Sequence, residues 1–392
     1  MNLYHQTGHR YQWNIDSILE DAAGDGLILS PINIEFSKIM EIDSELLLKS
    51  FFDPQLYRID DNKGKLTTYE YFPENIKCNY CTSDFDDHAN LIAQKCIDLQ
   101  LELNFKYLLI PTRYYDVWPT NYYDSHYKYF IEPFMNYIAT KNIQKDILLT
   151  VLVKQSQLVD DTKKNDLLNW VTGINGIKGI YLLFETNFTT KQIKDSEYLY
   201  QALLFIYFLK QNNLEVHIGY CNTESFLFSI SNPDSISMGS YENLRNFNVN
   251  RFITPEGEVI QSGPRARLYS SNLLQWIDYG YLGAFKRLYS SKINEIFEDS
   301  KYKPLMFEPE YNWHFQKAEP YKHYFYIFHK QIKEIPEGKV RLSYIKEKIN
   351  IALEYFADIK NSGIILDDNS DGSHLGFWLS AINMFEAFIK DK

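Results

Sequence analysis

The stretches ILLTVLVKQ at residues 147–155 and GIYLLFETN at 179–187 decide the fold, because each is a short apolar run that ends in polar residues. A strand that is buried on both faces has this pattern. Eight such runs, separated mostly by helix-like stretches, predict an α/β fold of the (β/α)8 TIM-barrel type. In chain order the eight runs occupy residues 26–31, 50–54, 107–113, 147–155, 179–187, 214–220, 235–240 and 248–255.

Helical periodicity between the runs supports the barrel. Residues 125–141 carry one apolar stripe, and Pro133 is expected to kink this helix or shift its start. Residues 198–209 are apolar almost all round, which is typical of a helix covered on two sides.

A break at residues 263–265 separates the predicted barrel, residues 1–262, from a mainly helical region, 263–392, that packs on it. Helices are predicted in this second region at residues 271–297, 317–334, 341–360 and 375–390. Residues 57–85 interrupt the alternation directly after the second run. A long excursion of this kind is either a lid over the site or a surface hairpin.

Composition excludes several classes of protein. The net charge of −11 argues against a surface that coats nucleic acid. Four cysteines in 392 residues indicate no disulfide framework and favour a reducing compartment. The first residues lack a secretory signal, and no apolar run approaches the length of a membrane span. We therefore predict a cytoplasmic, bacterial-type protein.

No motif for a nucleotide or a cofactor is present. G-x-x-x-x-G-K-[ST] and G-x-G-x-x-G do not occur, and neither do G-x-S-x-G or H-E-x-x-H. Cys78 and Cys81 have the spacing of a zinc-binding pair, but no second pair completes four ligands. Residues 367–372 imitate part of a calcium loop and favour a loop between helices. We predict neither a metal nor a cofactor.

Polar residues that follow the runs are the candidate site, since a barrel carries its active site beyond the carboxyl ends of its strands. Asp53 and Glu185 are the predicted catalytic pair, because two carboxyl groups in different environments can divide acid and base roles at a glycosidic carbon. The alternative is that each caps a helix or pairs with Lys154 or Arg113. The predicted ligand-binding residues after the first five runs are Ser30, Asn33, Gln55, Arg113, Tyr114, Lys154 and Asn187.

The end of the seventh run carries a possible phosphate site. Gly239 and Ser240 precede a short predicted helix, and barrels often bind phosphate at this place. Arg245, Arg265 and Arg267 can supply positive charge if the chain folds back over the barrel. An ordinary helix cap followed by exposed arginines is the competing interpretation.

Aromatic residues gather after the third run, where Tyr114, Tyr115, Trp118, Tyr122 and Tyr123 can stack on a sugar or a base or pack a loop onto the core. His323 and His329 are further, minor candidates in a helix that is predicted to be buried.

The strings ILSP, which contains Ser30, and DPQLY at residues 53–57 resemble the start of uncharacterised bacterial barrel proteins. The wider layout is similar to that of the tRNA-guanine transglycosylase-like barrels, including relatives that act on deazaguanine bases in DNA. The Asp-Ser-Gly-Gly nucleophile region and the clustered zinc cysteines of that family are missing here. The resemblance therefore implies a barrel and leaves base exchange open.

Two functions are consistent with the sequence. The first is an enzyme, of hydrolase or transglycosylase type, that acts on a nucleoside, a nucleic-acid base or a glycosidic bond. The second is a non-catalytic recognition or sensor subunit of a bacterial anti-phage defence system. The expected partner is a small or nucleotide-like molecule, and the helical tail can bind a protein partner or form a homodimer.

Overall fold

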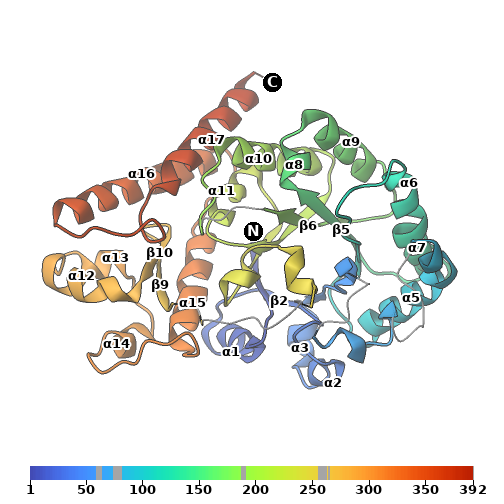
Figure 1. Cartoon of the computed structure of the whole chain (residues 1–392), viewed down its shortest axis with the longest axis horizontal. Coiled ribbons are helices and arrows are strands. Elements are labelled where there is room, and N and C mark those ends of the chain that lie inside the picture. The colour runs from blue at the N-terminus through green and yellow to red at the C-terminus, as the bar shows by residue number, and fades with distance from the viewer. Residues whose placement is uncertain (59–63, 74–81, 187–190, 255–262, 264, 392) are drawn as a thin grey trace.

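The computed structural model describes residues 1–58, 64–73, 82–186, 191–254, 263 and 265–391, with the backbone alone for 82–87. Eight parallel strands form one sheet that curves into a nearly closed barrel, and this confirms the predicted fold class (Figure 1). The strands follow the order β3-β2-β1-β8-β7-β6-β5-β4. They span β1 Asn2–Gln6, β2 Gly26–Leu29, β3 Phe51–Phe52, β4 Leu108–Ile110, β5 Ile147–Lys154, β6 Gly179–Glu185, β7 Glu215–Cys221 and β8 Ser235–Gly239.

The edge strands β3 and β4 face each other where the barrel closes. On one side of the gap the Lys106 backbone N–H donates to the Ser50 carbonyl at 2.9 Å, and on the other the Tyr114 N–H donates to the Tyr57 carbonyl at 2.9 Å. Two backbone hydrogen bonds therefore bridge the gap without a full ladder.

Seven of the eight apolar runs are strands, but the eighth is not. Residues Val249–Phe252 form a 3-10 helix, because the Asn248 side chain accepts from the Asn250 N–H and so favours a turn over an extended strand. The missing strand is β1, at the start of the chain. Its His5 and Gln6 are polar but buried, and they bond to the Ala23 carbonyl and the Ser30 hydroxyl. A search for apolar runs cannot find such a strand.

Helices surround the barrel in the expected alternation (Figure 1). The predicted helix at 125–141 is continuous with α6 but contains a π-helical turn, Tyr127–Ile131, directly before Pro133 in the first turn of α7. This is the disturbance expected of that proline. The helices of the barrel are α1 Tyr11–Asp21, α2 Phe36–Ile39, α3 Ser44–Leu47, α5 Thr82–Glu102, α6 Tyr122–His126, α7 Glu132–Thr140, α8 Gln155–Leu158, α9 Asp161–Thr172, α10 Ser196–Gln211 and α11 Ser225–Phe228.

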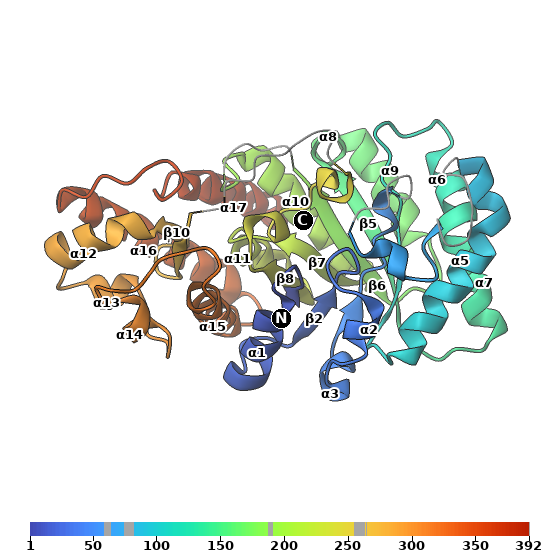
Figure 2. The same cartoon turned by 60° about the horizontal axis from the view of Figure 1, so that its bottom comes forward.

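The C-terminal region lies beside the barrel and shares its core (Figure 2). Helix α15, Glu319–Lys333, packs on α1 and β1, and the Phe325 ring lies 4.4 Å from the His5 ring. It thus covers the barrel where the helix after β8 is expected. Helix α17, His374–Lys390, packs on α10.

The remaining C-terminal elements build a second, smaller core. The prediction of one helix over 271–297 is wrong, because residues 267–278 form an antiparallel hairpin that turns at Leu274, where φ is +53°, and the rest contains two short α-helices. The other three predicted helices are present as α15, α16 and α17. The elements beside α15 and α17 are β9 Arg267–Ser270, β10 Gln275–Asp278, α12 Leu282–Leu288, α13 Ile293–Ile296, α14 Lys303–Met306 and α16 Val340–Asn361.

Candidate functional site

A cavity of about 270 Å³ lies at the carboxyl ends of β6 and β7, between the barrel and the β9–β10 hairpin. This is slightly below the roughly 300 Å³ at which typical small-molecule pockets begin. Its charged lining residues are Lys191, Glu224, Glu242, Arg245 and Arg267.

A β-bulge in β7 shapes the inner wall of the cavity. The pairing of β7 with β8 shifts register between Ile218 and Cys221, and Tyr220 has a positive φ of +54°. Gly219 is required beside it, since a Cβ at that position would lie 2.5 Å from the Tyr181 hydroxyl. Bulges and strained residues are frequent next to functional sites, because they re-aim side chains.

Glu224 lies in the loop that follows β7, where it precedes α11. Its side chain is buried and accepts from the Asn222 backbone N–H at 2.9 Å. Burial disfavours the carboxylate and raises the pKa of Glu224 to about 7, although the Asn222 N–H and the charge of Arg245 oppose this. Both protonation states of Glu224 are therefore accessible near neutral pH.

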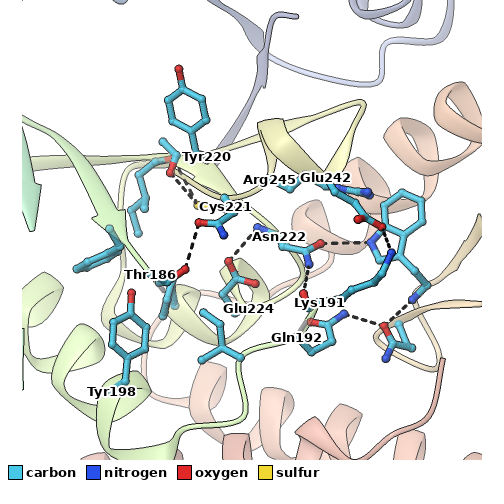
Figure 3. A pocket seen from close by; sticks show the side chains of 18 of the residues that line it. Thr186, Lys191, Gln192, Tyr198, Tyr220, Cys221, Asn222, Glu224, Glu242 and Arg245 are labelled. Atoms are coloured by element: carbon cyan, nitrogen blue, oxygen red, sulfur yellow. Dashed lines mark hydrogen bonds and ion pairs between the residues drawn. The ribbon is translucent and has the colours of Figure 1, made fainter. Parts of the chain in front are cut away.

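Glu242 enters the cavity from the 3-10 turn Glu242–Leu244, which follows β8. Gly239 lets this turn approach the strand, because a Cβ there would lie 2.1 Å from the Leu244 Cβ. Burial opposes ionisation of Glu242, but its ion pair with Lys191 and the charges of Arg245 and Arg267 outweigh burial and lower its pKa. In the view of Figure 3, Asn222 lies between the Glu224 and Glu242 side chains.

Arg245 stands at the end of the same turn and is only 6% exposed. Its guanidinium carbon lies 3.9 Å from the centre of the Trp276 ring and 5.6 Å from that of Tyr324. These rings hold the guanidinium group by cation–π contact. Two of its nitrogens, Nε and Nη1, are buried without a hydrogen-bond partner among the residues that the structure describes.

Arg267 reaches the cavity from β9, on the C-terminal side. Its Nη1 donates to the Asn369 carbonyl at 2.8 Å and to the Ser370 hydroxyl at 3.3 Å. Its Nε is buried and has no partner within the described part of the chain. Two arginines, one from each side of the cavity, therefore line it, and each keeps at least one buried nitrogen without a partner among the described residues.

The predicted catalytic residue Asp53 lies in the barrel interior and does not line this cavity. The Tyr57 hydroxyl contacts both carboxylate oxygens at 2.9 Å, and the Gln55 N–H donates to Oδ1 at 3.1 Å. Burial raises the pKa of Asp53 to about 7, against the effect of these hydrogen bonds. The Gln55 amide donates to the Tyr220 hydroxyl at 3.0 Å, so Tyr220 links this network to the cavity wall.

Aromatic rings close the barrel above Asp53. The Tyr57 ring lies 5.0 Å from Phe247 and 4.9 Å from Phe252, and all three side chains are buried. The turn that replaces the eighth predicted strand carries Phe252, so the centre of the barrel mouth is packed.

The other predicted catalytic residue, Glu185, belongs to a separate group at the ends of β5 and β6. The Tyr114 hydroxyl donates to it at 3.2 Å, and the Lys154 Nζ lies 4.1 Å from the centre of the Tyr114 ring. Burial raises the pKa of Glu185, while Tyr114 and Lys154 lower it. Arg113 lies nearby in the chain, with its guanidinium carbon 5.4 Å from the centre of the Tyr115 ring.

Eight of the fourteen predicted site residues thus fall into three groups. Ser30, Asp53 and Gln55 meet in the barrel interior, where the Ser30 hydroxyl accepts from Gln6 at 2.9 Å. Glu185, Tyr114 and Lys154 form the second group, and Arg245 and Arg267 form the third.

Five further predicted residues belong to none of these three groups. Gly239 and the buried Ser240 lead into the turn that carries Glu242. The Asn33 Nδ2 is buried without a partner among the described residues. Arg265 points to solvent and pairs with Asp278 at 3.4 Å. Asn187 lies outside the described residues, as do Cys78, Cys81 and part of the 57–85 excursion.

The remaining candidates have structural contacts. The rings of Trp118 and Tyr122 stack with their centres 3.8 Å apart, and the His126 ring stacks on the same tyrosine at 5.2 Å. These contacts agree with the second alternative from the sequence, in which the aromatic residues pack a loop onto the core. His323 is buried and bonds to the Ser300 hydroxyl, while His329 lies 3.7 Å from Asp25.

Sequence reasoning missed Glu224, Glu242, Lys191 and Trp276. A signal for two of them was present, since Glu224 follows the sixth run and Glu242 follows the seventh. Extending the rule for strand ends by a few residues finds both. Lys191 and Trp276 reach the cavity from a long loop and from a hairpin, and no periodicity marks them.

Within the described residues, no group of three or more His, Cys, Asp or Glu side chains is arranged to hold a metal ion. No helix in the same ranges is long and apolar enough to cross a membrane. Comparison with models of protein families and with curated proteins finds no match to this chain.

Proposed function

We propose that this chain is a barrel enzyme that cleaves or exchanges a glycosidic bond of a nucleoside or a related small molecule in the cavity beside β6 and β7. One observation carries the proposal: two carboxyl groups with opposite pKa shifts, Glu224 and Glu242, line one cavity at the carboxyl ends of barrel strands. Groups whose pKa values are pushed apart by their surroundings are suited to separate acid and base roles.

The division of roles follows from the protonation states. Glu224, protonated for much of the time near neutral pH, donates a proton to the leaving group as the glycosidic bond breaks. Glu242, held ionised by Lys191, stabilises the positive charge that develops at the sugar carbon, or activates the water that attacks it. If Glu242 stabilises the sugar cation, the Glu224 carboxylate takes the proton of the attacking water and becomes the acid again. If Glu242 activates the water, Glu242 takes that proton, and exchange with solvent returns Glu224 to the acid and Glu242 to the carboxylate.

Amide side chains in the cavity favour a ligand with hydroxyl or base-edge groups. Asn222, Gln192 and Gln275 all line it. They are held in place, because Trp276 donates to the Asn222 side chain at 3.2 Å and Gln192 donates to Gln275 at 2.7 Å. Fixed polar groups between apolar walls provide orientation and specificity. The small volume favours a free molecule over a polymer.

A panel of nucleosides and nitrophenyl glycosides tests the proposal, with Glu224→Gln as the diagnostic variant. We expect turnover of one class and its loss in the variant. Glu298→Gln is the matched control, because Glu298 is partly buried with a pKa that desolvation likewise raises to about 7, but it bonds to Ser271 and Asn272 away from the cavity. Equal activity in Glu224→Gln and the parent contradicts the assignment.

The second candidate function, a non-catalytic recognition or sensor subunit, uses the same cavity. The buried donors of Arg245 and Arg267 suit ligand binding whether or not a reaction follows. Binding of a nucleoside without any turnover across the panel favours this alternative. The catalytic roles of Asp53 and Glu185 and the resemblance to transglycosylase-like barrels stay predictions, and Asp53→Asn and Glu185→Gln in the same assay test the first of them.

A further inference from the structure

We infer that the ligand of this cavity carries a phosphate group, which binds between Arg245 and Arg267. The inference rests on the proposed function in so far as both use the same cavity. It goes further, because it names the chemical class of the ligand.

The first argument is the unused hydrogen-bonding capacity of the two side chains. Arg245 is 6% exposed and Arg267 is 8% exposed, and both retain buried donors without a partner among the described residues. A buried charged group without partners is costly, so such groups are rare unless a ligand completes them. Both arginines line the cavity, so an anion bound there lies beside two guanidinium groups that are incompletely paired within the described part of the chain.

The second argument is the way Arg245 is held. Its guanidinium carbon lies 3.9 Å from the centre of the Trp276 ring, so this contact restrains the group before a ligand arrives. A guanidinium group held over an aromatic ring still has N–H groups for hydrogen bonds, and these suit phosphate oxygens. Pre-organised donors reduce the entropy cost of binding.

The third argument is charge. Arg245, Arg267 and Lys191 contribute three positive charges and Glu242 one negative charge, so the lining carries +2 when Glu224 is protonated. The whole chain has a net charge of −11, which makes this positive cavity a local exception. A phosphate monoester carries about −1.5 to −2 near pH 7 and balances the cavity, whereas a carboxylate leaves it positive.

The geometry also explains why the site needs both parts of the chain. Arg245 follows β8 of the barrel, while Arg267 begins β9 of the C-terminal hairpin. The Asn369 carbonyl, in the loop before α17, orients Arg267 at 2.8 Å. The C-terminal region therefore supplies half of the anion site, in addition to covering the barrel.

Calorimetric titration with ribose 5-phosphate, inorganic phosphate, ribose and acetate tests the inference on the full chain. We expect both phosphates to bind at least tenfold more tightly than ribose or acetate. Arg267→Gln should weaken ribose 5-phosphate binding about 10- to 100-fold, the usual effect of losing one charge-assisted contact. Acetate binding as tightly as inorganic phosphate overturns the inference.

Arg265→Gln is the matched control, because Arg265 lies on the same segment, two residues away, but is exposed and pairs with Asp278. It should bind ribose 5-phosphate like the parent. Equal weakening in both variants, or none in Arg267→Gln, contradicts the inference. Arg267→Lys keeps the charge and serves as a second variant if Arg267→Gln unfolds, with intermediate affinity expected.

These measurements are independent of turnover. Phosphate binding that depends on Arg267, together with an inactive panel, supports the phosphate site and rejects the enzymatic proposal. Turnover that is lost in Glu224→Gln but unchanged in Arg267→Gln supports the enzymatic proposal and rejects the phosphate site.

Discussion

The barrel mouth and the neighbouring cavity are both built from polar residues at the carboxyl ends of strands, yet they differ in whether those residues already have partners. In the mouth, Tyr57 and Gln55 bond to Asp53, and Phe247 and Phe252 cover them. In the cavity, buried nitrogens of Arg245 and Arg267 have no partner among the described residues. A fully paired network stabilises the fold, whereas unpaired buried nitrogens mark the place where we expect a ligand.

The largest expected difference between the two places is in catalysis. With a substrate of the panel, Glu224→Gln should lower kcat about 10²- to 10⁴-fold, the usual contribution of an acid–base group. Asp53→Asn should lower kcat less than about tenfold, since Asp53 is linked to the cavity through Tyr220 and, within the described residues, can do no more than position that side chain in the cavity wall. Steady-state kinetics on both variants check this. A larger loss in Asp53→Asn shifts the chemistry to the barrel centre and supports the prediction from sequence.

The packed state of the mouth can be tested by removing one ring. Phe252→Ala should lower the free energy of unfolding by about 3–5 kcal/mol, because a buried phenyl group is lost and leaves a void above Tyr57. Phe377→Ala, at an exposed position of α17, should change it by about 0.5 kcal/mol or less. Urea unfolding measures both. Similar values for the two variants contradict a closed mouth.

Stability should also depend on pH through Asp53. Its pKa is about 7 in the folded chain against an ordinary value of 3.8, so the folded state binds the proton more tightly. The contribution of this carboxyl group is complete at low pH and is lost as the pH rises through about 7. Asp53→Asn removes this change, and we expect the difference in unfolding free energy between parent and variant to move by on the order of 3 kcal/mol between about pH 4 and pH 8. A difference that stays constant over this range contradicts the buried state of Asp53.

The smallest expected effect is on stability, and it compares a hydrogen-bonded residue of the barrel mouth with an arginine of the cavity that has nitrogens unpaired within the described residues. Gln55→Met should destabilise the chain by about 2 kcal/mol, because the Ile32 N–H loses its acceptor and the Tyr220 hydroxyl loses the donor Gln55. Arg245→Met should instead stabilise the ligand-free chain by about 1 kcal/mol, since it removes buried donors without partners. Thermal unfolding gives the sign in each case. Destabilisation by both substitutions indicates that Arg245 serves the fold.

Much of the fold follows from local patterns. Strands such as β5 and β6 are apolar along their length because helices and the barrel interior cover both faces, and this pattern is visible in a single sequence. Strand β1 is not visible as an apolar run, because its polar Gln6 is buried and bonds to Ser30, the residue that follows β2. From sequence alone, a polar residue is expected to be exposed, because its buried hydrogen-bond partner is not visible there.

The candidate site was predictable only in part. The glycine at position 239 and the arginines that follow it indicated an anion site, and Arg245 and Arg267 do line the cavity. The same reasoning also included Arg265, which precedes β9, faces solvent and pairs with Asp278. The direction of a side chain depends on how the hairpin packs, and residue type does not reveal it.

By itself, the sequence determined the barrel, because burial of parallel strands imposes an apolar pattern on each strand separately. Only the tertiary structure decided which polar residues are open to a ligand. Asp53 and Arg245 both follow barrel strands, but one has hydrogen-bond partners and the other has free donors. Those partners come from segments far apart in the chain, so their presence is a property of the packed molecule.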